Sequence, residues 1–246
     1  MIDILRSEWT KIRSVRSTVW TLAVTVVLMA GLSALVSGAS KNNPGGPVSA
    51  EEAIIISLLG IMFAQLSMAT LGVLVISSEY RTGGIRTSLM AVPRRMSLLT
   101  GKFVIFTVTS LIVSAVASAA AIGIGLAISQ PPSVEMGDVA RAVLGATLYL
   151  TACGVFGLGL GTLIRHTPGA LVSAIALMLV LPTVANQLPG QWGRTVAEYF
   201  TTNAGMLIVT NQGQGSLGPW SGFGVYLVWV VVAAIAGAVL MQRRDA

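Results

Sequence analysis

The stretch AVLGATLYLTACGVFGLGLGTLI, residues 142–164, contains no Lys, Arg, Asp or Glu. A helix needs about 20 mostly apolar residues to cross the hydrocarbon core of a bilayer, so this stretch is long enough for one crossing. Five other stretches share its lack of charge: residues 20–40, 53–78, 103–134, 167–193 and 199–242. The sequence therefore predicts an all-α, polytopic membrane protein forming a single domain, with transmembrane helices at about residues 19–37, 53–77, 103–129, 141–163, 168–185 and 222–241.

Composition excludes a water-soluble protein. Hydrophobic residues make up 54% of the 246-residue chain, and its mean hydropathy is +0.82, which is too apolar for a soluble core to bury. The net charge of +6 does not indicate nucleic-acid binding, because the basic residues flank the apolar stretches, where anionic membrane lipid is the expected partner.

The basic residues also predict the orientation, because Lys and Arg concentrate in short cytoplasmic loops. With the N-terminus inside, twelve of the fifteen basic residues fall in cytoplasmic segments: Arg6, Lys11, Arg13, Arg16, Arg81, Arg86, Arg94, Arg95, Lys102, Arg165, Arg243 and Arg244. Only Lys41, Arg141 and Arg194 fall outside. We therefore expect a multi-pass protein of the cell membrane with both termini in the cytoplasm.

Residues 1–17 predict a helix that lies flat in the membrane interface. Ile2, Leu5, Trp9 and Ile12 share one side at helical spacing, and basic residues cover the other. Glu8 interrupts this apolar stripe. A charged flank that only sets orientation is the alternative interpretation.

Several classes of membrane protein are excluded by what the sequence lacks. No ionisable residue falls in the middle of a predicted span, which argues against a proton-coupled transporter. There is no GxxxxGK[ST] phosphate loop, and a single histidine, His166, cannot build an intramembrane metal site. A lone cysteine, Cys153, allows no internal disulfide. We expect no enzymatic activity, no cofactor and no metal on this chain, so that any energy comes from another protein.

Residues 78–102 form the segment best suited to receive force from such a protein. Glu79 and Arg81 stand at the predicted exit of the second span, and Gly83 with the following glycine permits a sharp turn. Residues 85–90 could then form a short helix that displays Arg86. A loop that merely fixes orientation is the alternative. The long outer segment 186–221 carries aromatic residues among Gly, Gln and Asn, which is typical of interfacial or re-entrant helices.

Two segments carry a resemblance to a known family. The opening SEWTKIRSVRST, residues 7–18, and the exit of the second span, SEYRTGGIRTSL, residues 78–89, resemble those of ABC-2 type transporter permeases of the six-span kind common in actinobacteria. The resemblance implies a type V exporter-like permease that pairs with a second permease copy, identical or not. It also implies a cytosolic ABC ATPase partner that carries ATP and Mg. The residues it marks for coupling to that ATPase are Glu79, Arg81, Gly83 and Arg86, with Trp9, Arg13 and Arg16 in a secondary role.

In such permeases the second and fifth spans line the dimer interface. The polar residues of these spans are few, and they are the candidates for the pathway: Gln65, Ser67, Thr70, Ser173 and Thr183. A largely apolar pathway favours an amphiphilic or hydrophobic cargo, such as a drug, an antimicrobial peptide or a lipid. The alternative function is a membrane anchor or sensor subunit that binds an ATPase without transporting anything.

Overall fold

The computed structural model describes residues 2–41, 48–83 and 95–243, and this part of the chain is almost entirely helical. Six stretches of it are long and apolar enough to cross a membrane. They are α2 (Arg16–Lys41), α3 (Ala50–Ser57) together with α4 (Ile61–Thr82), α6 (Arg95–Ser129), α7 (Met136–Ile164), α8 (Thr167–Ile175) together with η1 (Ala176–Val180) and α9 (Leu181–Ala185), and α12 (Pro219–Arg243). The predicted all-α membrane fold with six transmembrane helices is confirmed.

Helix α7 is the centre of the bundle. It packs against α4, α6, α12, α8 and α11, and most of its residues are buried. Its glycines let neighbouring helices approach closely. A Cβ atom on Gly72 of α4 would overlap the Gly154 carbonyl oxygen and lie 2.6 Å from the Leu158 nitrogen, and one on Gly157 would lie 2.8 Å from the Ala69 Cα. Backbone contact through small residues is the usual way for helices to associate where no hydrophobic effect drives them together.

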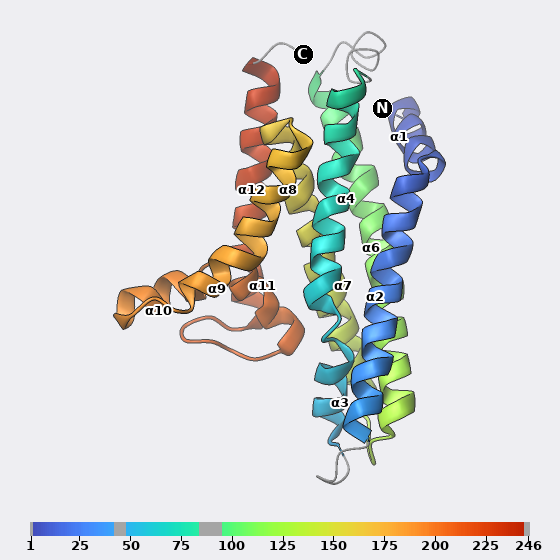
Figure 1. The fold of residues 1–246 in the computed structure, drawn as a ribbon, viewed down its shortest axis with the longest axis vertical. Coiled ribbons are helices and arrows are strands. Elements are labelled where there is room, and N and C mark those ends of the chain that lie inside the picture. Colours follow the sequence, from blue (N-terminus) through green and yellow to red (C-terminus); the bar gives the residue numbers. More distant parts are fainter. Residues whose placement is uncertain (1, 42–47, 84–94, 244–246) are drawn as a thin grey trace.

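Two of the spans are not a single regular α-helix. Residues 58–60 separate α3 from α4, at a point where a Cβ on Gly60 would lie 3.0 Å from the Leu28 carbonyl oxygen of α2. The sequence predicted one uninterrupted span there, because the apolar pattern continues through the break. In the fifth span, the π-helix η1 is followed by Leu181 and then by Pro182, which has no N–H group, and the span bends at this point (Figure 1).

Residues 186–221 contain two short helices, α10 (Gly190–Glu198) and α11 (Thr201–Thr210). Helix α10 projects away from the bundle, whereas α11 turns back and packs against α12 and α7 (Figure 1). The Glu198 carboxylate joins the end of α10 to the loop before α12. It accepts hydrogen bonds from the Ser216 and Leu217 backbone N–H groups at 2.5 and 2.9 Å.

Helix α1 (Ile2–Ser14) lies across the bundle end where α4 and α12 finish and α6 begins (Figure 1). We call this the α1 end. The opposite end carries α3 and the start of α7.

Candidate functional site

Helix α1 buries the side that carries Ile4, Glu8 and Ile12. These residues, spaced four apart, are 9%, 2% and 9% exposed. Trp9, which the sequence places with Ile12 on the side facing the membrane interface, is 47% exposed. The buried face packs on α6, where a Cβ atom on Gly101 would lie 2.6 Å from the Ile4 Cγ2. A glycine in α6 therefore lets α1 come close enough to place Glu8 inside.

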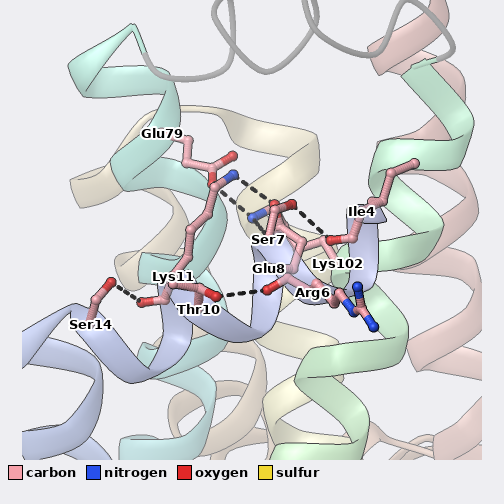
Figure 2. A network of polar contacts seen from close by, with 9 residues as sticks. All are labelled: Ile4, Arg6, Ser7, Glu8, Thr10, Lys11, Ser14, Glu79 and Lys102. Carbon is pink, nitrogen blue, oxygen red and sulfur yellow. Dashed lines mark hydrogen bonds and ion pairs between the residues drawn. The ribbon is translucent and has the colours of Figure 1, made fainter. Parts of the chain in front are cut away.

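Glu8 enters a cluster of four charged side chains that we call the charge cluster: Glu8, Lys11, Glu79 and Lys102 (Figure 2). Lys102 donates to Glu8 Oε2 at 2.5 Å and to Glu79 Oε1 at 2.9 Å. Lys11 donates to Glu8 Oε1 at 2.7 Å and to Glu79 Oε1 at 3.0 Å. The two ammonium groups and two carboxylates thus alternate in charge and join three helices, α1, α4 and α6.

The electrostatics of the charge cluster hold its α1 members in their charged forms. Burial raises the pKa of Glu8, but Lys102 and Lys11 outweigh this effect and keep that pKa below its ordinary value of 4.5. Burial lowers the pKa of Lys11, but hydrogen bonds to Glu8 and Glu79 outweigh this and raise that pKa above its ordinary value of 10.5. Burying an ion pair costs desolvation free energy, which is recovered only where each charge lies against an opposite charge. The pairing in the charge cluster therefore favours this one placement of α1.

The charge cluster also joins the two ends of the segment between α4 and α6, and we call these joined ends the base of the segment. Glu79 is in the last turn of α4, and Lys102 lies two turns into α6, where the sequence had placed it in the loop. Gly83 ends α4 in the left-handed conformation, with a φ of 72°, as the predicted turn requires. The predicted helix at 85–90, with Arg86, falls outside the described residues. Both ends of this segment are therefore fixed to α1 by ion pairs.

A comparison with protein families matches the part of the chain that contains the charge cluster. The model of a family described as ABC-2 family transporter protein matches residues 4–185, which begins in α1 and ends with the fifth span. The match covers almost three quarters of the chain. The chain belongs to the ABC-2 transporter family. The resemblance found in residues 7–18 and 78–89 is thereby confirmed. No curated protein matches the sequence.

A second set of contacts holds the end of α4 in this ABC-2 protein. The guanidinium of Arg165 lies over the ring of Tyr80, 5.0 Å from its centroid, and Arg165 Nη2 donates to the Leu240 carbonyl oxygen of α12 at 3.2 Å. Thr167, at the start of α8, donates to the Ser77 hydroxyl at 3.0 Å. The last turn of α4 is therefore connected on one side to α1 and α6, and on the other to α7, α8 and α12.

The other predicted coupling residues lie on the surface at the same end. Arg81, Arg13 and Arg16 are exposed, as is Trp9. The structure thus brings Glu79 into the charge cluster and leaves the arginines available for contacts outside the chain.

The predicted pathway residues do not form one surface. Gln65 is buried, and its Oε1 accepts a hydrogen bond from the Tyr149 hydroxyl of α7. Ser67 shares a hydrogen bond of 2.9 Å with Thr25 of α2. Thr70 and Ser173 are half-buried, and Thr183 is exposed with its hydroxyl bonded to its own helix. The polar groups of α4 are therefore used inside the bundle, which leaves its outward face largely apolar.

Sequence reasoning missed Glu8, Lys11 and Lys102 as members of a site. The available signal was Glu8 itself, because it interrupts an apolar stripe between Ile4 and Ile12 at four-residue spacing. A carboxylate on a buried face requires a cationic partner, but the partner 94 positions away is set by tertiary packing. Among the described residues, no group of His, Cys, Asp and Glu side chains could hold a metal ion.

We expect the charge cluster to stabilise α1 across a defined pH range. The folded pKa of Glu8 is lowered, so its contribution is complete above 4.5 and disappears as the pH falls through that folded pKa. The folded pKa of Lys11 is raised, so its contribution is complete below 10.5 and disappears as the pH rises through it. The measurement is the melting temperature of the detergent-solubilised protein against pH, for wild type and for Glu8→Gln. Wild type should be more stable at neutral pH and lose this advantage in acid. An advantage that is constant from neutral to acidic pH would contradict the assignment.

Proposed function

We propose that this ABC-2 family membrane protein is the permease subunit of an exporter driven by a separate cytosolic ATPase. Two permease copies, identical or of two kinds, form the pathway, and the α1 end faces the cytoplasm. The ATPase binds ATP and Mg and docks on the segment between α4 and α6. The family supports a transport component of the membrane, and the finer assignments are our inference.

The observation that carries the proposal is the charge cluster. A rigid connection is needed if a push on a loop is to move helices rather than bend the loop. Lys102 and Glu79 fix the two ends of the segment to each other at 2.9 Å. Glu8 fixes Lys102 to α1, and Lys11 fixes Glu79 to α1. A force applied there is transmitted to α1, α4 and α6 together. Arg81, Arg13 and Arg16 are exposed at the same end of the bundle and suit a partner with acidic groups on its docking face.

The apolar surface of α4 and of the fifth span supports a proposal for the class of cargo. Gln65 and Ser67 are engaged inside the bundle. Large apolar side chains of α4 and the fifth span are exposed: Met62, Phe63, Val172, Ile175 and Val184 are each more than 40% exposed. A pathway between two such surfaces favours an amphiphilic or hydrophobic molecule such as a drug, an antimicrobial peptide or a lipid.

The test uses the complex purified from its native cells and reconstituted in lipid vesicles. The probes are a fluorescent phospholipid and a fluorescent amphiphilic cation, and the measurement is ATP-dependent movement of each across the bilayer. Movement of either probe supports the exporter. ATP hydrolysis by a bound ATPase with no movement of either would favour an anchor or sensor subunit instead.

In the same vesicles, Arg81→Ala and Arg86→Ala should each reduce the rate of ATP-driven probe movement about fivefold, the effect of losing one charged contact at a protein interface. Arg194→Ala, on exposed α10 away from the α1 end, is the matched control and should leave the rate unchanged. Equal rates in all three variants, or an equal loss in Arg194→Ala, would contradict docking at the α1 end.

A further inference from the structure

The fifth span bends where its backbone hydrogen bonding changes register. The Leu181 N–H bonds to the Ala176 carbonyl, five residues back, as in a π-helix. The next residue, Pro182, has no N–H group. In a continuing α-helix that missing donor would serve the Met178 carbonyl, and in a continuing π-helix it would serve the Leu177 carbonyl. Residue 182 therefore provides no hydrogen-bond donor to either carbonyl group.

Side chains of α11 provide donors to these two carbonyl groups. The Thr201 hydroxyl donates to the Leu177 oxygen at 2.6 Å, and the Thr202 hydroxyl donates to the Met178 oxygen at 2.9 Å. Thr201 is 0% exposed and Thr202 is 7% exposed. In a transmembrane segment a carbonyl without a donor costs several kcal/mol, so neighbouring hydroxyl groups that reach a proline bend stabilise it.

The next residue extends the same arrangement beyond the bend. The Asn203 Nδ2 donates to the Ala197 oxygen of α10 at 2.9 Å, to Asn186 Oδ1 at 3.1 Å and to the Pro182 oxygen at 3.4 Å. Three consecutive side chains of α11 thus contact η1, α9 and α10. Figure 1 shows that α10 leaves the bundle immediately beyond this bend.

Apolar packing secures only one side of α9. Pro182 and Ala185 are buried, whereas Val180, Leu181 and Val184 are 48%, 41% and 52% exposed. The polar contacts to α11 therefore act beside limited side-chain packing in setting the direction of α9 and α10.

We propose that Thr201, Thr202 and Asn203 are positioning residues that set the bend of the fifth span and, through it, the direction of α10. This inference goes beyond the proposed export function and does not depend on it. When the two threonine bonds are lost, α9 and α10 swing relative to α7, because the bend has lost the donors that fix it.

The test measures the distance between spin labels on α10 and α7 in the full-length protein in lipid nanodiscs without nucleotide. The labels are attached at Gln191→Cys and Met136→Cys, both exposed, while Cys153 is buried and the unsubstituted protein gives the labelling background. Wild type should give one narrow distance distribution. Thr202→Val should increase the population at other distances about fivefold, the effect of one hydrogen bond on an equilibrium, and Thr201→Val should increase it again.

Three variants separate positioning from general damage. The double variant Thr201→Ser with Thr202→Ser keeps both hydroxyl groups and should keep the narrow distribution. Thr210→Val removes a hydroxyl from the same helix that bonds only within α11, at 3.4 Å to the Met206 oxygen, and should also have no effect. Pro182→Ala adds the missing N–H, so it should reduce the effect of Thr202→Val. A distribution unchanged by both valine substitutions, or broadened equally by Thr210→Val, would overturn the proposal. So would a Thr202→Val effect that Pro182→Ala leaves undiminished.

Discussion

Replacing Lys102 by methionine should lower the free energy of unfolding by about 3 kcal/mol. Lys102 and Glu8 are each 2% exposed, and Lys102 also pairs with Glu79. The substitution removes a charge that both carboxylates need while they remain in a poorly hydrated place. Methionine fills most of the same volume, so the loss reports on charge rather than on a cavity. The measurement is reversible unfolding in mixed detergent micelles.

Two comparisons make this result specific. Lys41→Met removes an exposed lysine from the end of α2 and should change stability by less than about 0.5 kcal/mol. The double variant Glu8→Gln with Lys102→Met should be more stable than the sum of the two single losses predicts, because the two residues are in direct contact. A loss for Lys102→Met no larger than that for Lys41→Met would contradict a buried charge cluster.

Gly72→Ala should separate α4 from α7 and cost about 3 kcal/mol, at the upper end of the effect of overpacking. The new Cβ atom would overlap the Gly154 carbonyl oxygen and lie 2.6 Å from the Leu158 nitrogen, and backbone atoms cannot rotate away as a side chain can. The same unfolding measurement applies.

Gly123→Ala is the matched control within a transmembrane helix. Nothing lies within 4 Å of a Cβ atom at Gly123 in α6, so alanine should be neutral or stabilise by about 0.5–1 kcal/mol through its better helix propensity. Equal free energies of unfolding for the two alanine variants would contradict the close approach of α4 and α7.

The features that sequence predicted correctly depend on local chemistry. The lack of charge over residues 142–164 is sufficient to predict a transmembrane helix, because the bilayer imposes the length. Gly83 ends α4 because glycine adopts the left-handed conformation at little steric cost, which is a property of the residue itself.

The features that sequence did not predict depend on packing between distant segments. Glu8 was recognised as an interruption of a stripe, but its pairing with Lys102 requires α1 to lie on α6, with Gly101 leaving the room. The break at residues 58–60 lies where α2 comes close to Gly60, a contact that the apolar pattern of the span does not encode. Gln65 was predicted to face a pathway, yet only the position of Tyr149 on α7 shows that its side chain is engaged inside the bundle.

The central claim is that a separate ATPase docks at the α1 end, beside the base that the charge cluster fixes. The most direct measurement places a photo-crosslinking amino acid at the exposed Arg81 in native cells and identifies the crosslinked proteins by mass spectrometry, with the same amino acid at exposed Trp192 of α10 as the control. The account predicts that position 81 crosslinks to a soluble subunit bearing a phosphate loop and that position 192 does not. Crosslinks from position 81 only to lipid or to this chain itself, or the same ATPase captured from position 192, would contradict it.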